Sequence, residues 1–170
     1  TRLSKRAAKS DRDATFPFYD FNYLRNAGFL GLCVPERFGG FGADLETYCL
    51  VSSENAKGNG STALCFNMHC LTMLMMGELS EPLEMTSEQR KRHERLRSEN
   101  FAEVIEKGVF YGQPHSEPVE EGETDSSLPQ GGRRFGTTAE KVDGGYTING
   151  RKFFVSLSDA ADYFSTPCIL

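Results

Sequence analysis

The stretch GGYTINGRKFFVSLSDAADYF, residues 144–164, decides how the last part of the chain folds. Its Asn149-Gly150 pair lies between apolar alternations, and such a pair favours a tight hairpin turn because both residues accept positive φ. Side chains alternate along a strand, so Phe154 and Ser156 should share one face. That face would hold a flat ring beside a hydroxyl and would suit a planar heteroaromatic ligand. A strand buried on both faces is the alternative that the same pattern allows.

Composition places the chain among ordinary globular proteins. Its 170 residues are enough for one domain, or for one domain and part of another. The net charge of −5 argues against a general nucleic-acid surface. No apolar run reaches the roughly 18 residues that a membrane span needs. The N-terminal TRLSKRAAKSDRD is basic and lacks an apolar core, so it does not have the pattern of a secretory signal.

The five cysteines form no C-x-x-C pair, which indicates reduced thiols in the cytoplasm more than a disulfide framework. The three histidines are far apart and near no matching cysteine pair, so we expect no zinc site. We therefore predict a cytoplasmic protein without a membrane span, a metal centre or a nucleic-acid partner.

Helical patterns fill the first two thirds of the chain. In FPFYDFNYLRNAG, residues 16–28, Phe18, Phe21 and Leu24 can form one apolar stripe. Gly28 follows as a plausible stop. The glycine-rich GLCVPERFGGFGADL that comes next should be a loop, because no helix would keep so many glycines.

Capping residues predict where the later helices begin. Asp44 should cap a helix that runs to about Lys57, and Ser61 should cap a second helix. Thr86 and Gln89 have the spacing of a capping box and should open a third, long helix. The dense mixture of basic and acidic residues in this third helix predicts a solvated face.

The second of these helices, STALCFNMHCLTMLMMGE, is apolar nearly all round and should be buried. Its methionines are expected to fill gaps in the core more than to line a cofactor site. His69 within it could contact a ligand, but a core histidine with satisfied hydrogen bonds is the favoured interpretation.

The periodicity changes after Gly108 from helical to strand-like runs. GVFYGQPHSEP and TTAEKVDGGYTINGRKFFV contain short β patterns, the second as strand, turn and strand. Helices followed by strands predict an α+β fold. We divide it into an N-terminal α-helical domain, residues 1–109, and an incomplete middle β domain, residues 110–170.

The polar stretch VEEGETDSSLPQGGRRFG lies between the two β patterns and should be a surface loop. Acids gather at its start and could suggest a metal or acid–base site, but acids in a glycine-containing loop are usually solvated. The sequence contains no glycine-rich phosphate loop and no G-x-S-x-G elbow. The acids considered for a metal or acid–base site are Glu117, which lies just before this stretch, and Glu120, Glu121, Glu123 and Asp125 within it.

Four stretches carry a resemblance to a known family: LRNAGFLGLCVPERFGGFGADL, SSENAKGNGSTALCFNMH, QPHSEP and DGGYTINGRKFFVS. In their order and spacing they resemble the N-terminal and early middle portions of acyl-CoA dehydrogenases, and the likeness covers nearly the whole chain. It implies an N-terminal helical bundle, then the first strands of a β-barrel-like domain. The family's C-terminal helical domain would be missing.

The resemblance implies FAD as the cofactor. Carried over residue by residue, it places Gln113, His115 and Ser116 at the edge of the flavin. It places Phe154 where the family usually stacks a tryptophan, and Ser156 where the family usually has a hydroxyl that bonds the flavin. A phenylalanine offers a π face, and small hydroxyls can satisfy ring nitrogen and oxygen atoms.

Departures from the family pattern affect the substrate side. The family's Gly-Ser-Asp is replaced by residues 122–125 with a longer loop, which makes Thr124 the candidate for the phosphate- and substrate-side contact. If the acids around Thr124 face the substrate mouth, they should repel the phosphates of coenzyme A. His115 replaces a residue that is usually apolar in the family.

The family reaction would be α,β-dehydrogenation of acyl-CoA or another acyl thioester, with electrons leaving through an electron-transfer flavoprotein. A homodimer or homotetramer is expected. The family's catalytic glutamate lies in the C-terminal domain, so we assign no catalytic residue in this chain. Two alternatives are a flavin-dependent monooxygenase of the same fold and a non-catalytic acyl- or protein-binding module.

Overall fold

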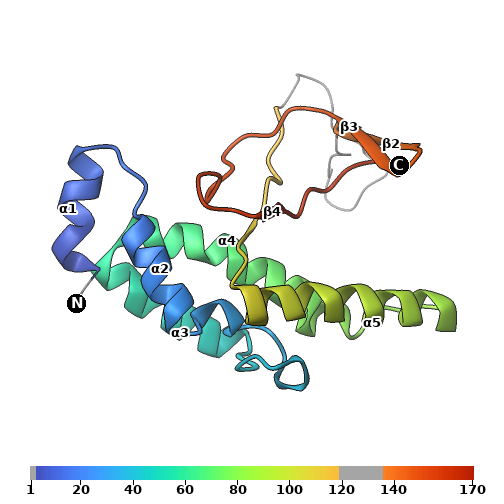
Figure 1. Cartoon of the computed structure of the whole chain (residues 1–170), viewed down its shortest axis with the longest axis horizontal. Coiled ribbons are helices and arrows are strands. Elements are labelled where there is room, and N and C mark those ends of the chain that lie inside the picture. Colours follow the sequence, from blue (N-terminus) through green and yellow to red (C-terminus); the bar gives the residue numbers. More distant parts are fainter. Residues whose placement is uncertain (1–2, 119–135) are drawn as a thin grey trace. The chain divides into compact units, whose positions relative to one another are not determined.

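The structure, a computed structural model, describes residues 3–118 and 136–170. Helices fill the first two thirds of the chain and short strands follow, which confirms the predicted α+β class (Figure 1). The chain divides into two compact units. We call Thr1–Gly112 with Ser156–Tyr163 the helical unit, and Gln113–Val155 with Phe164–Leu170 the hairpin unit.

The helical unit is built from α-helices joined by short 3₁₀ turns, and a π-helical segment, η4 (Glu103–Lys107), extends its last helix. The turns are η1 (Phe29–Gly31), η2 (Glu36–Phe38) and η3 (Glu78–Ser80). None of the helices in the described part of the chain is long and apolar enough to cross a membrane. The helices are α1 (Ser4–Arg12), α2 (Phe18–Asn26), α3 (Leu45–Gly58), α4 (Gly60–Met76) and α5 (Ser87–Ala102).

The predicted caps of α3 and α5 are confirmed. The Asp44 side chain accepts a hydrogen bond from the Thr47 N–H over 2.8 Å, which satisfies one of the unpaired donors at the start of α3. The Thr86 hydroxyl accepts from the Gln89 N–H, and the Gln89 side chain accepts from the Thr86 N–H. These two bonds form the predicted capping box.

The predicted cap of α4 is wrong. Asn59, not Ser61, occupies the cap position, and its side-chain oxygen accepts from the N–H groups of Ser61 and Thr62 over 3.1 and 3.3 Å. Asn59 has an extended backbone and a side chain long enough to reach back over the first turn. The helix therefore begins at Gly60, two residues after α3 ends at Gly58.

In α2, two of the three residues predicted for the apolar stripe lie in the core. Phe21 and Leu24 are buried, whereas Phe18 is 52% exposed, so its assignment to the stripe is wrong. Gly28 has a φ of 76° and ends the helix as predicted. The residue of α2 that the pattern did not identify as buried is Asp20.

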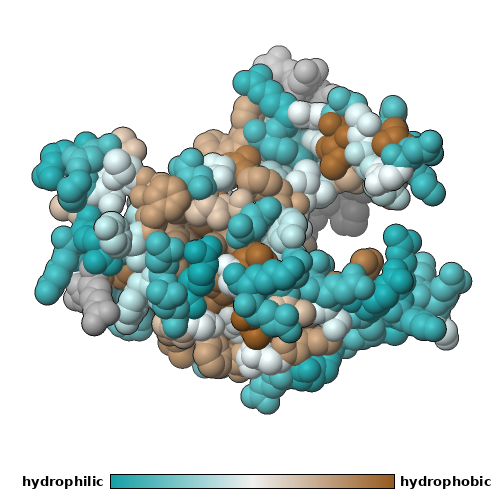
Figure 2. All heavy atoms as spheres, viewed as in Figure 1, coloured by the Kyte–Doolittle hydropathy of each residue, from teal (hydrophilic) through white to brown (hydrophobic). Residues whose placement is uncertain are grey.

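α4 supplies much of the core of the helical unit. Met73 is buried there as predicted, but Met75 lies on the surface, so the expected core role fails for that methionine. Hydrophilic side chains cover α5, which agrees with the predicted solvated face (Figure 2). Among the charged residues of α5 the exception is Arg97, which is only 2% exposed. The largest fully buried aromatic rings are Phe21, Phe66, Phe101 and Phe110.

Short strands form two small sheets within the described residues, with no closed barrel. β1 (Tyr111–Gly112) pairs with β4 (Tyr163–Phe164), where the Tyr163 N–H donates to the Phe110 carbonyl over 3.1 Å. In the hairpin unit, β2 (Thr138–Val142) runs antiparallel to β3 (Gly145–Asn149).

The hairpin turn lies at Asp143-Gly144, so the turn predicted at Asn149-Gly150 is wrong. Val142 lies opposite Gly145, and Gly144 supplies the positive φ, 82°, that a two-residue turn needs. An Asp-Gly pair serves a hairpin as well as an Asn-Gly pair, so local sequence alone could not choose between the two positions.

Gly150 allows a close approach between chain segments instead. A Cβ atom there would lie 2.3 Å from the Thr137 hydroxyl oxygen and 2.7 Å from the Thr137 Cα, well inside van der Waals contact. Thr137 is itself buried and begins the approach to β2. The hairpin unit therefore needs a residue without a side chain at position 150.

No regular strand begins directly after Gly150, since the next strand is β4, and this overturns the predicted alternation. A single bridge pairs Ser116 with Phe153, and Phe154 then takes a positive φ of 51°. A left-handed residue turns the chain and breaks the two-residue period. Phe154 and Ser156 therefore do not share the face of a strand.

We predict that Gly150→Ala lowers the free energy of unfolding by roughly 1–3 kcal/mol, because Thr137 must move to admit the methyl group. Gly145→Ala in the same hairpin is the matched control, since no atom lies within 4 Å of its Cβ position. It should change stability by less than about 1 kcal/mol. Urea unfolding of both variants measures the difference, and equal stabilities would contradict the close approach.

Candidate functional site

The segment that leaves β1 carries three of the residues expected at the flavin. Gln113 is buried, the His115 N–H donates to the Gln113 carbonyl over 3.0 Å, and Ser116 is exposed. The Phe153 N–H donates to the Ser116 carbonyl over 2.8 Å, which joins this segment to the chain after the hairpin. The hairpin unit therefore brings Gln113, His115 and Ser116 together with Phe153 and its neighbour Phe154.

Phe154 presents its ring to solvent. It is 87% exposed, whereas Phe153 beside it is half-buried and lies under the guanidinium of Arg151, 4.9 Å from the ring centroid. The left-handed backbone of Phe154 is rare for a bulky residue and costs about 1–3 kcal/mol, so surrounding contacts must impose it. An aromatic ring held outward in this way offers a π face to a planar ligand.

His115 is the titratable group among these positions. Burial, and then the charge of Lys152, lower the pKa of His115 below its ordinary value. The imidazole is therefore neutral at neutral pH and can donate from one ring nitrogen and accept at the other. That pairing suits a heteroaromatic edge that carries both donors and acceptors.

The remaining two site predictions fall elsewhere. Ser156 belongs to the helical unit, where it is partly buried and precedes the buried Leu157. Thr124 lies outside the described residues, as do Glu120, Glu121, Glu123 and Asp125. The flavin and substrate roles given to Ser156 and Thr124 stay predictions.

Sequence reasoning missed a heavily bonded side chain among the described residues of the hairpin unit, that of Glu117. Its carboxylate lies 2.5 Å from the Lys152 ammonium and accepts from the Thr137 hydroxyl and from the N–H groups of Gly136 and Thr137. The two charged side chains are only 7% and 10% exposed. The expectation that Glu117 is a solvated loop acid is therefore wrong. The available signal was that QPHSEP contains one acidic residue and NGRKFF two basic residues, each beside a β pattern.

The charge state of Glu117 follows from these bonds. Burial on its own would raise the pKa of this carboxyl, but the hydrogen bonds from Lys152, Thr137 and Gly136 outweigh it and lower the pKa to about 2. Glu117 is therefore ionised throughout the neutral range and is a very weak base.

His69 is a core histidine, as predicted. Its Nε2 donates to the Leu30 carbonyl over 2.9 Å, and its Nδ1 accepts from the Tyr111 N–H over 3.1 Å. This pattern requires the neutral form, and burial lowers the pKa of His69 to about 4. The imidazole thereby connects η1, α4 and β1.

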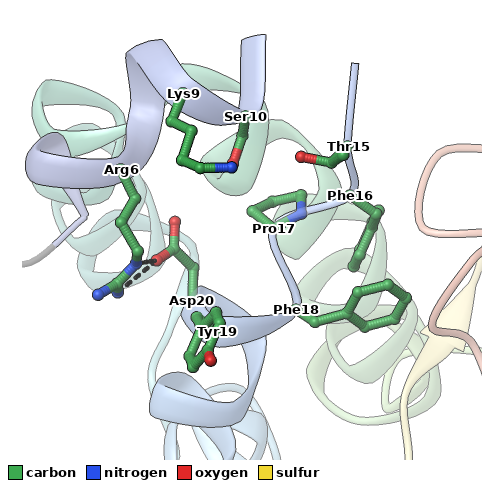
Figure 3. A pocket seen from close by; sticks show the side chains of 9 residues that line it. All are labelled: Arg6, Lys9, Ser10, Thr15, Phe16, Pro17, Phe18, Tyr19 and Asp20. Atoms are coloured by element: carbon green, nitrogen blue, oxygen red, sulfur yellow. Dashed lines mark hydrogen bonds and ion pairs between the residues drawn. The ribbon is translucent and has the colours of Figure 1, made fainter. Parts of the chain in front are cut away.

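A pocket of about 270 Å³ in the helical unit lies where α1 faces the start of α2 (Figure 3). Aromatic and proline side chains form much of its lining, and Arg6 reaches from α1 to the buried Asp20 (Figure 3). Arg6 Nη2 lies 2.7 Å from Asp20 Oδ1, while Asn59 and Thr62 donate to Asp20 Oδ2. The Arg6 charge is thus already paired, and the pocket contains none of the predicted flavin residues.

A solved structure with the same fold and a family model both match this chain. FMN-bound TdsC from Paenibacillus sp. A11-2 superposes with a TM-score of 0.75 over 98% of this chain and 36% of its own, at 20% identity. The model of the acyl-CoA dehydrogenase N-terminal domain matches residues 1–93. The chain belongs to the acyl-CoA dehydrogenase family.

Two curated relatives match more of the chain than the family model does. Benzylmalonyl-CoA dehydrogenase of Aromatoleum aromaticum is 30% identical over 96% of this chain and 38% of its own length. Dibenzothiophene monooxygenase of Rhodococcus qingshengii is 31% identical over 82% of this chain and 28% of its own length. The chain therefore spans 38% of the length of the dehydrogenase and 28% of the length of the monooxygenase.

We predict that His69 makes the helical unit less stable in mild acid. The folded pKa of about 4 lies below the ordinary 6.5, so the unfolded chain binds the extra proton. The stabilisation is fully present above about pH 6.5 and is lost as the pH falls towards 4. At 1.36 kcal/mol per pKa unit, the free energy of unfolding should fall by about 2 kcal/mol between pH 7 and pH 5.

Urea unfolding at the two pH values measures this loss. His69→Gln keeps a donor and an acceptor but does not titrate, so it should flatten the pH dependence. His93→Gln on α5 is the control and should leave the dependence in place. A wild-type slope that survives in His69→Gln would refute the assignment to His69.

Proposed function

We propose that this chain forms the first part of an FAD-dependent acyl-CoA dehydrogenase, which introduces an α,β double bond into an acyl thioester. The likeness to benzylmalonyl-CoA dehydrogenase supports this most, because it extends over 96% of the chain and so includes both units. The electrons would leave through an electron-transfer flavoprotein. The full protein would work in the cytoplasm as a homodimer or homotetramer.

The residues of the hairpin unit fit a flavin. The exposed Phe154 ring would stack on the isoalloxazine, and Gln113, His115 and Ser116 would supply hydrogen bonds along its edge. Ser156 would add a second hydroxyl and Thr124 a contact on the substrate side. When bound, FAD would supply the acceptor for the hydride that leaves the substrate β-carbon.

We assign the base that removes the α-proton to no described residue. Glu117 is the acid nearest the flavin positions in sequence, but its pKa of about 2 makes it a poor proton acceptor, and its oxygens already accept four hydrogen bonds. The chain's own contribution is therefore to bind and orient the flavin and to exclude water. We propose no catalytic residue within it.

A flavin-dependent monooxygenase is the second candidate. It is favoured by the 31% identity to dibenzothiophene monooxygenase, and the TdsC structure of the same fold contains FMN. A neutral histidine at position 115 would also suit a polar substrate beside the ring. A non-catalytic acyl- or protein-binding module is the third, and it would bind no flavin.

The discriminating experiment uses the gene product that contains these residues, at its full encoded length. We expect a yellow protein that releases FAD on denaturation and reduces a dye acceptor when acyl-CoA substrates of several chain lengths are supplied. Bound FMN, together with oxygen-dependent oxidation of dibenzothiophene when reduced flavin is supplied, would replace the dehydrogenase by the monooxygenase. A colourless protein that binds neither FAD nor FMN would favour the third candidate, the non-catalytic binding module.

We predict that Phe154→Ala weakens flavin binding in that protein about fivefold, the loss that corresponds to a stacking contribution on the order of 1 kcal/mol. Phe153→Ala is the matched control. Because its ring is half-buried against Arg151, it should lower stability more than flavin affinity. Phe154→Trp should retain the affinity. Flavin titration of the apoprotein measures all three, and equal losses for both alanine variants at equal folded fraction would argue against stacking by Phe154.

A further inference from the structure

The Glu117–Lys152 pair lies directly beside the one bridge that joins the two flavin-facing segments. Ser116 pairs with Phe153 in antiparallel fashion, so the next residues along, Glu117 and Lys152, also lie opposite each other. The bridge has one backbone hydrogen bond, from Phe153 to Ser116, and is not extended into a ladder. A single bond fixes register poorly, and the neighbouring ion pair adds a second link between the two segments.

The pair is also tied to two further segments. The Glu117 carboxylate accepts from the N–H groups of Gly136 and Thr137, where the chain enters β2. The Lys152 ammonium donates a second bond to the Pro167 carbonyl over 2.9 Å. Four segments of the hairpin unit therefore meet at one nearly buried ion pair.

The conformation of Phe154 depends on this anchoring. Its left-handed backbone is unfavourable and persists only where its neighbours are fixed on both sides. Lys152, two residues earlier, is fixed by Glu117 and Pro167. Loss of these bonds would free Phe154 to return to an extended conformation and turn its ring.

We propose that Glu117 and Lys152 are positioning residues for the flavin, which hold the edge group at Ser116 and the stacking ring of Phe154 in their binding geometry. The inference rests on the flavin binding proposed above and adds the residues that pre-organise it. Neither residue needs to touch the flavin. Glu117 acts through its neighbour Ser116, and Lys152 acts on Phe154, two residues further along the chain.

Lys152→Met tests the proposal in the full-length protein. It removes the charge and both hydrogen bonds while keeping most of the side-chain volume. The dissociation constant for the flavin should rise on the order of tenfold, as when a supporting partner of a ligand-holding group is removed. The visible absorption spectrum of the bound flavin should also shift, because Phe154 no longer stacks in the same place. Lys152→Arg keeps the ion pair and should restore both readouts.

Arg97→Met is the matched control for simple destabilisation. Arg97 is also a nearly buried cation, paired with Glu81 and Glu94, but it lies in the helical unit. It should lower the unfolding midpoint without shifting the flavin spectrum. If Lys152→Met does not fold, Glu117→Gln replaces it, since an amide can accept only part of the hydrogen bonds that the carboxylate accepts.

The outcomes separate this inference from the proposed function. A parent protein that binds no flavin would overturn both. A flavin-binding parent whose Lys152→Met and Glu117→Gln variants keep its affinity and spectrum would overturn the positioning role alone. The same conclusion would follow if Arg97→Met, at an equal loss of stability, shifted the spectrum as much as Lys152→Met.

Discussion

The neutral imidazole of His69 fixes the chain where helices give way to strands. It donates to the Leu30 carbonyl and accepts from the Tyr111 N–H, so one buried side chain of α4 satisfies backbone groups on both η1 and β1. Each of these groups would otherwise be buried without a partner, at a cost of about 1–3 kcal/mol. The apolar core packs around the imidazole, and an imidazolium there would lose its acceptor nitrogen. The hydrogen bond that holds the start of β1 therefore requires His69 Nδ1 to be unprotonated.

The hairpin unit is organised by the opposite requirement, a charge that must be present. Ionised Glu117 can accept from the Lys152 ammonium, from a hydroxyl and from two backbone N–H groups. A buried ion pair stabilises a fold only when other hydrogen bonds support it, and here the carboxylate accepts three further bonds and the ammonium also donates to the Pro167 carbonyl. Few apolar side chains are buried among the described residues of this unit, so polar bonds carry more of their structure than they do among the helices. That balance explains how an aromatic ring as exposed as Phe154 can be held in a strained conformation.

Local signals in the sequence predicted local structure well. Asp44 and Thr86 could be predicted as helix caps because each side chain accepts from an N–H group only three residues further along the chain. The errors came where two local candidates competed, as at Ser61, or where tertiary contacts decided. Gly150 is a residue type that favours a hairpin turn, but here the lack of a side chain allows Thr137 to approach its backbone closely. The bonds of Glu117 join residues 19 to 35 positions apart, and no pattern within one segment contains them.

The pKa values of Glu117 and His115 limit what these two residues can contribute to catalysis. A catalytic base needs a pKa near the working pH, and the pKa values of the two titratable residues at or beside the positions proposed for the flavin, Glu117 and His115, are both lowered. The pKa of Glu117 is lowered to about 2 by its partners, and burial keeps His115 neutral. Both shifts favour a fixed charge state over proton exchange with a substrate. A flavin placed against Phe154 and Ser116 would therefore meet groups that orient it and do not change charge during the reaction, and proton transfer would fall to residues outside this set.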